Sequence, residues 1–242
     1  MADIKLTQDA TLFNSVCNHE KVFSKVSWIE HKLDIQPLLD RGEGYVIECG
    51  EYGGFFLHRS DFSRYIIHTA FLPDTPRGLP LESAKEALWL FFMSTDCQHL
   101  SSSACDSNPA AKRLMRMCGF KEDFQSPSRF NKSLKESFYS LSIDDYIRSS
   151  EDCKKLGEEF HLIVEETTNH EDDDVHDQYA GAAIALIRGG NYLKAEQVYN
   201  RWALLAGYEP MYVDEIDKLV EVGNLEISLS NDMKYIEEVL CR

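Results

Sequence analysis

The thirteen residues from Asn108 to Phe120, NPAAKRLMRMCGF, contain signals for both the start and the end of a helix. Asn108 is a residue type that caps helix N-termini, and Pro109 suits the first helical position because an N–H there has no intrahelical partner. Gly119 suits the left-handed conformation that often follows the last helical turn. We therefore expect a helix over residues 110–117 and a return to a sheet from Phe120.

Apolar segments before this helix predict the strands of a sheet. Residues 44–49 and 54–59 flank a short turn that begins and ends with glycine, and this spacing is typical of a β-hairpin. Residues 64–72 form a longer and more continuous apolar segment, as expected for a central strand. A further strand is predicted at residues 99–104, shortly before Asn108.

Segments with helical spacing alternate with these strands. Apolar residues recur at helical intervals over residues 12–16, 22–26 and 81–93. Pro37 interrupts residues 33–39, which we interpret as a connector. The pattern predicts an α+β fold in which helices flank a sheet.

This order of elements resembles the fold of the GNAT acyltransferase family. Residues 108–120 are similar to the Asn-x-x-Ala…Gly-Phe segment of that family, and Arg77-Gly78 resembles the start of its pyrophosphate-binding loop. A narrower likeness, in residues 68–78 and 138–141, is to GNAT-like proteins of tailed bacteriophages and prophages. The resemblance implies a GNAT-like mixed sheet.

The resemblance, which covers residues 7–141, also implies a set of site residues. The residues that would bind acetyl-CoA are Leu72, Arg77, Gly78 and Asn108. His68 on the central strand would be the catalytic base, since the intrinsic pKa of histidine lies near neutrality. Simpler roles remain open for each: a structural histidine at position 68, a loop contact for Arg77 and a helix cap at Asn108.

Three residues depart from the family's pattern. Where the family has Gly or Ala in the pyrophosphate loop, this chain has Pro80 and Glu82. Proline has no N–H to offer a phosphate, and glutamate adds negative charge at that place. Met115 stands where the family often has Tyr, and a thioether cannot donate a proton. The departures favour a degenerate site, with no cofactor expected; acetyl-CoA is expected only for an active enzyme.

Charge divides the chain near residue 136. The whole chain has a net charge of -16, of which residues 1–135 contribute -1 and residues 136–242 contribute -15. We therefore expect a GNAT-like domain over residues 1–135 and an acidic helical domain over residues 136–242. Nucleic acid is not an expected partner, because phosphate binding needs a basic face. A mean hydropathy of -0.35 and short apolar runs argue against a membrane span.

The acidic domain is expected to be helical, with segments at 142–167, 177–188, 192–206, 213–222 and 230–241. Residues 190–210 resemble the second half of a TPR hairpin, so the second and third segments, joined through Gly189-Gly190, are expected to form a TPR-like helical hairpin. The acidic run 171–174 is interpreted as charge at a helix N-terminus rather than a calcium site, because EF-hand spacing is absent, and no metal site is expected. Seven scattered cysteines without a CxxC pair indicate a reducing compartment.

Three functions are compatible with these features. The first is a bacteriophage protein whose GNAT scaffold acts in the virion or in contacts with other phage or host proteins, with a homo-oligomer left open. The alternative is an active acetyl-CoA-dependent N-acetyltransferase that modifies a protein or a small-molecule amine. A third is an inhibitor that presents its acidic surface to a basic host protein. The phage resemblance implies a location in the host cytoplasm and in the virion.

Overall fold

A computed structural model describes residues 4–26, 31–128, 131–164 and 174–206. The chain forms two compact units, and each is described by itself. Unit 1 comprises Met1–Phe92 and Cys97–Ile143, and unit 2 comprises Met93–Asp96 and Asp144–Arg242. The sequence predicted a boundary between two domains near residue 136. That the two parts fold independently stays a prediction.

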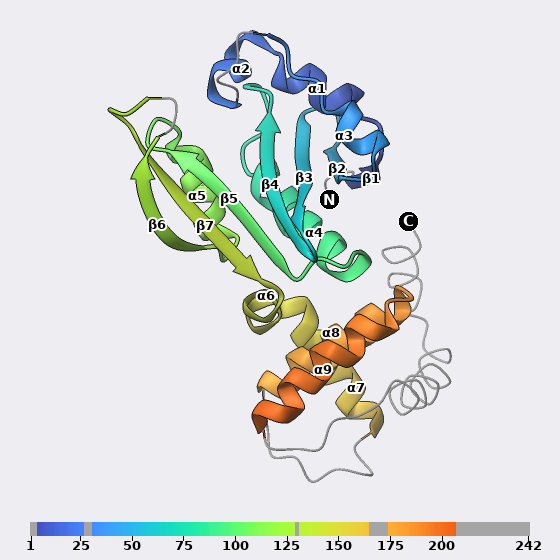
Figure 1. Ribbon diagram of the computed structural model, residues 1–242. Coiled ribbons are helices and arrows are strands. Elements are labelled where there is room, and N and C mark those ends of the chain that lie inside the picture. The colour runs from blue at the N-terminus through green and yellow to red at the C-terminus, as the bar shows by residue number, and fades with distance from the viewer. Residues whose placement is uncertain (1–3, 27–30, 129–130, 165–173, 207–242) are drawn as a thin grey trace. The chain divides into compact units, whose positions relative to one another are not determined.

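Unit 1 is an α+β unit built on one sheet (Figure 1). Its elements are β1 (Ile4–Thr7), α1 (Thr11–Cys17), α2 (Glu20–Val26), α3 (Gln36–Asp40), β2 (Gly44–Cys49), β3 (Gly53–Asp61), β4 (Arg64–Phe71), α4 (Leu79–Ser94), β5 (His99–Cys105), α5 (Pro109–Met117), β6 (Lys121–Pro127) and β7 (Lys135–Ser142). The strand order is β1-β2-β3-β4-β5-β7-β6. Neighbouring strands are antiparallel except β4 and β5, so the sheet is mixed. The predicted α+β class, a mixed sheet flanked by helices, is confirmed.

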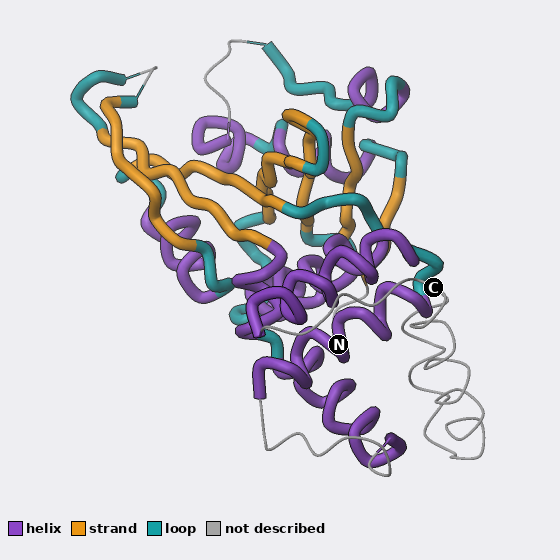
Figure 2. The backbone as a smooth tube through the Cα atoms, turned by 60° about the horizontal axis from the view of Figure 1, so that its bottom comes forward, coloured by secondary structure: helices purple, strands orange, loops and turns teal. Residues whose placement is uncertain are grey.

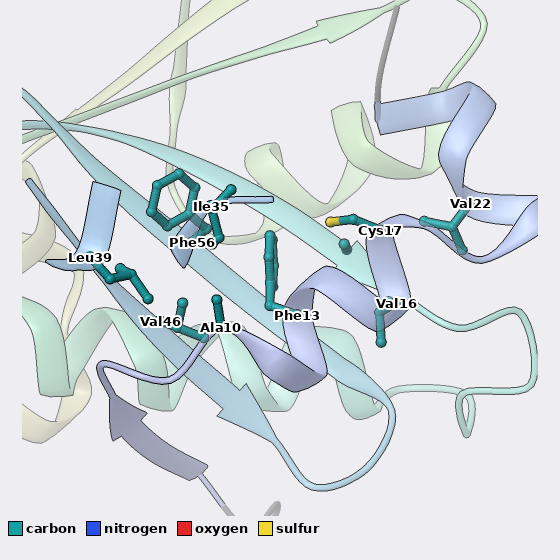
Figure 3. Packing of buried hydrophobic residues seen from close by; sticks show 10 residues of the cluster. Ala10, Phe13, Val16, Cys17, Val22, Ile35, Leu39, Val46 and Phe56 are labelled. Atoms are coloured by element: carbon teal, nitrogen blue, oxygen red, sulfur yellow. The ribbon is translucent and has the colours of Figure 1, made fainter. Parts of the chain in front are cut away.

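Two apolar layers hold the sheet between helices. On one face, Phe13 of α1 packs against Phe56 of β3 with ring centroids 6.1 Å apart, within a cluster that also contains Val46 (Figure 3). On the other face, Phe91 of α4 makes edge contacts with Tyr65, at 4.9 Å between centroids. Such buried aromatic contacts stabilise the layers beyond the area they bury. Strands and helices of unit 1 are distinguished by colour in Figure 2.

The structure corrects two expectations about unit 1. Residues 33–39 were expected to be a connector, but α3 begins at Gln36 and holds Pro37 in its first turn. Proline is tolerated there because the N–H it lacks would have no intrahelical partner. Ile4–Thr7 was not predicted as a strand, and it pairs antiparallel with β2 at the edge of the sheet.

Unit 2 is helical, with α6 (Ile143–Ser149) at its start and then α7 (Glu151–Val164), α8 (Asp174–Arg188) and α9 (Tyr192–Ala206). The single helix expected over residues 142–167 is instead two helices, α6 and α7, because the helix is interrupted at Ser150. Ser150 Oγ accepts a hydrogen bond from the Cys153 N–H at 3.2 Å, which caps the start of α7. The helices α8 and α9 form a hairpin, and its likeness to TPR stays a prediction. The segments predicted at 213–222 and 230–241 lie outside the described residues, as does most of the acidic run 171–174.

Glycines set the distance between α7 and α8. A Cβ on Gly181 would lie 1.9 Å from the Cys153 carbonyl oxygen, and a Cβ on Gly157 would lie 1.9 Å from that of Asp177. Real Cβ atoms do not approach oxygen this closely, so both positions require glycine for the two backbones to meet. Nearby, Asp144 accepts hydrogen bonds from Tyr179 Oη and Arg201 Nη1 at 3.1 and 2.8 Å.

No helix among the described residues is long and apolar enough to cross a membrane.

Candidate active site

The parallel strands β4 and β5 pair over only part of their length. Their ladder comprises Arg64↔His99, Tyr65↔Leu100 and Ile66↔Ser101, and it stops there although both strands continue. The two strands start side by side, and their C-terminal ends lie further apart (Figure 1). The sheet therefore opens between Ile67–Phe71 and Ser102–Cys105.

Backbone polar groups of β4 face this opening. Ser102 Oγ donates a hydrogen bond of 3.0 Å to the Ile67 carbonyl, which therefore points towards β5. Because backbone groups alternate in direction along a strand, those of Thr69 point the same way. Thr69 Oγ1 is buried and has no hydrogen-bond partner among the described residues. A buried hydroxyl without a partner is uncommon in proteins, which indicates a place where a ligand could supply one.

His68 lies on the opposite face of β4 from Thr69. Its ring stacks on Phe56, with centroids 5.7 Å apart, and Phe56 also stacks on His58. The surrounding protein, and then the nearby His58, lower the pKa of His68 to about 4. Because the ring is also exposed to solvent, water offsets part of this effect. The downward direction means that His68 is neutral at neutral pH, the form in which a histidine can accept a proton.

The segment after β4 leads into the N-terminus of α4. The Leu72 carbonyl accepts hydrogen bonds from the Thr75 N–H and Oγ1, at 3.2 and 2.6 Å, which form a turn. Gly78 has a φ of 99°, a conformation that glycine adopts without strain. Its carbonyl accepts the N–H groups of Leu81 and Glu82 and so starts α4. Arg77 is exposed beside it.

Two residues make this helix N-terminus unusual as a phosphate site. Pro80 lies in the first turn of α4 and contributes no N–H. The Glu82 side chain folds towards Gly78, since a Cβ on Gly78 would lie 3.7 Å from Glu82 Oε1. A carboxylate is stabilised at this end of a helix dipole, but it would repel a phosphate in the same place.

The helix α5 starts where β5 ends. Asn108 accepts a hydrogen bond from the Ala111 N–H at 3.2 Å, which is the N-cap contact, and Gly119 ends the segment with a φ of 83°. Met115 is buried, so its thioether belongs to the packing of α5. The roles of Asn108 in acetyl-CoA binding and of Met115 in replacing a proton donor stay predictions.

The predicted site residues lie on β4 or follow the C-terminal ends of β4 and β5. Leu72, Arg77 and Gly78 follow the C-terminal end of β4, and Asn108 follows that of β5. His68 lies on β4 beside the opening. Sequence reasoning missed Thr69, because neither the absence of its partner nor the end of the ladder leaves a pattern in the sequence.

Among known proteins, similarity to this chain was found only in solved structures. No family model and no curated protein matches the chain. Similar structures include spermidine N-acetyltransferase from Vibrio cholerae in complex with CoA and spermine, at 16% identity and a TM-score of 0.48, over 60% of this chain and 98% of that one. A GNAT-family acetyltransferase from Bacillus anthracis is similar at 16% identity and a TM-score of 0.46, over 59% and 96%.

A third similar structure is aminoglycoside acetyltransferase AAC(6')-Ib with coenzyme A and kanamycin, at 14% identity and a TM-score of 0.46, over 61% and 99% of the two chains. Each match covers nearly all of the known protein and about three fifths of this one. The values are too low to assign a family, substrate or activity to this chain.

Proposed function

We propose that the chain is an acyl-CoA-dependent N-acyltransferase. The observation that carries this proposal is the opening between β4 and β5 beyond Ile66↔Ser101. An exposed strand edge pairs with amide groups, and the pantetheine arm of coenzyme A contains amides. The unpartnered Thr69 Oγ1 fits such an arm as well, because it lacks a hydrogen-bond partner where the strand edge is free.

The residues near the N-terminus of α4 have opposing effects on the phosphates of acetyl-CoA. Arg77 and the N-terminus of α4 would attract its phosphates, whereas Pro80 and Glu82 weaken that attraction. The bound thioester would supply the acyl group: a C–N bond would form to the amine, the C–S bond would break, and coenzyme A would leave as its thiolate. His68, neutral at physiological pH, can accept the proton that the amine loses, directly or through water.

Titration calorimetry with acetyl-CoA tests this proposal. We expect the chain to bind it, and the R77Q variant to bind about fivefold more weakly, because one phosphate contact is lost (~1 kcal/mol). Arg113 on α5 is likewise exposed, and R113Q is the matched control, with unchanged affinity. Acetyl transfer to an amine, followed through thiol release, then tests the chemistry. No binding at millimolar acetyl-CoA would overturn the proposal.

A second candidate is a scaffold that has lost acyl-CoA binding and acts through contacts with other proteins. The position of the Glu82 carboxylate over Gly78 favours it, since negative charge already lies where phosphate would bind. The phage origin, the virion association and the host-cytoplasm location implied by the phage resemblance belong to this candidate and stay predictions. Absence of acetyl-CoA binding together with a stable fold would support it.

A further inference from the structure

One face of the sheet beyond the opening is not covered by a described helix. The helix α5 lies on the other face, where Met115 and Tyr139 are buried and Lys112 Nζ donates to Ser137 Oγ at 2.9 Å. Because side chains alternate along a strand, Phe138 and Ser140 of β7 point away from α5.

Two stacked aromatic rings lie on this uncovered face, of which Phe124 is exposed and Phe138 is half-buried. Phe124 of β6 and Phe138 of β7 are cross-strand partners, and their rings stack at 4.6 Å with an interplanar angle of 12°. Phe124 is 57% exposed. Exposed aromatic surface of this kind is unfavourable in water unless a partner covers it, so the pair indicates a binding surface.

Two carboxylates flank the aromatic pair. Asp123 Oδ1 accepts a hydrogen bond from Ser140 Oγ at 2.8 Å, and Glu136 Oε1 accepts one from Ser103 Oγ at 2.6 Å. A carboxylate has about four lone-pair sites, so each retains capacity for a further donor. Lys121 also lies on this face, as the cross-strand partner of Ser140. We name Asp123, Phe124, Glu136 and Phe138 the aromatic–acidic face.

This chemistry suits a cationic side chain. The face of an aromatic ring attracts a guanidinium or ammonium group, and the two carboxylates add to that attraction. A small molecule is usually held in a concave site that buries most of its surface, whereas Phe124 and Asp123 are exposed on a sheet face. A polypeptide can cover such a face, and the carboxylates of Asp123 and Glu136 favour one with basic side chains.

The register connects this face to the opening. Ser103 of β5 is the direct partner of Phe138, and both lie on the same side of the sheet as His68. We infer that the acceptor is a polypeptide, and that a basic side chain near its reacting amine binds the aromatic–acidic face. The chemistry at the amine rests on the proposed acyltransferase function, while the binding can be measured without acetyl-CoA.

Binding of a synthetic peptide of glycine, serine and lysine tests this inference, with a peptide that has glutamine for lysine as its control. We expect the lysine peptide to bind the full chain more tightly than the glutamine peptide. D123N and F124A should each weaken it about threefold, and the double variant with E136Q and F124A about tenfold. The matched control is E122Q, because Glu122 is adjacent to Asp123 but bonds to Arg116 and Tyr139 on the α5 face.

Each outcome decides one question. Equal binding of the two peptides, or an E122Q effect as large as that of D123N, would overturn the polypeptide surface. Spermidine, a small polycation, should bind this exposed face more weakly than the lysine peptide; spermidine binding as tight as that of the peptide would also overturn it. Lysine-peptide binding with the expected losses but no acetyl transfer would leave the surface standing and count against the acyltransferase instead.

Discussion

Replacement of Glu82 by glutamine should raise the affinity for acetyl-CoA. The carboxylate lies over Gly78, where a Cβ would be 3.7 Å from Oε1, so a phosphate held by this helix N-terminus would lie within about 4–6 Å of it. Two like charges at about 4 Å repel by ~1 kcal/mol in water, and a pyrophosphate carries about two charges. Screening by physiological salt removes part of this repulsion, which leaves ~1 kcal/mol, or about fivefold in affinity.

The same substitution should lower the stability of the free protein. A carboxylate in the first turn stabilises a helix by about 0.5 kcal/mol, and glutamine loses this contribution. Calorimetry of acetyl-CoA binding and thermal unfolding without ligand should therefore change in opposite directions.

Glu86 provides the graded control for this experiment. It lies one turn further along α4, about 6 Å further from the N-terminus, so E86Q should change affinity less than twofold. The gain in E82Q should also shrink as salt is added. An unchanged affinity in E82Q, or an equal gain in E86Q, would refute the placement of phosphate at this helix.

Three further predictions concern stability and pH. G181A should destabilise unit 2 by about 3 kcal/mol in urea unfolding, because the added Cβ would overlap the Cys153 oxygen, whereas G189A, with 3.4 Å to its nearest neighbour, should change stability by less than about 1 kcal/mol. Lowering the pH from 6.5 towards 4 should destabilise the wild type by about 1 kcal/mol more than H68Q, because the unfolded chain binds a proton on His68 that the folded chain, with its lowered pKa, does not; equal pH profiles would contradict this. N108A should cost about 1 kcal/mol of stability and N108D almost nothing, since aspartate keeps the cap to Ala111.

Local signals in the sequence account for most elements of unit 1. The Asn108-Pro109 start and the Gly119 end of α5 are determined by backbone chemistry within a few residues, and both are confirmed. The hairpin of β2 and β3 likewise follows from its glycine-bounded turn. The short strand β1 escaped prediction because four residues hold too little pattern, and its existence depends on pairing with β2.

The candidate site was only partly predictable. His68, Leu72, Arg77 and Gly78 could be named because a motif or a strand carries them, although their roles stay predictions. The opening beside Thr69 could not be predicted, since it depends on where the ladder between Arg64↔His99 and Ile66↔Ser101 ends, and these partners are far apart in sequence. Phe124 and Asp123 were missed for a related reason: their shared face arises from a register shift between Glu122 and Phe124.

The parallel ladder between β4 and β5 has three paired positions and divides the sheet into two antiparallel halves, β1 to β4 and β5 with β7 and β6. This number is lower than for any other pair of neighbouring strands in the described sheet, so the ladder is the least paired junction of the sheet. A molecule bound between the two strands would connect the two halves of the sheet beyond this ladder. Binding should then make the unfolding of the two halves more cooperative. Slow amide hydrogen exchange should extend from one half into the other when the ligand is bound.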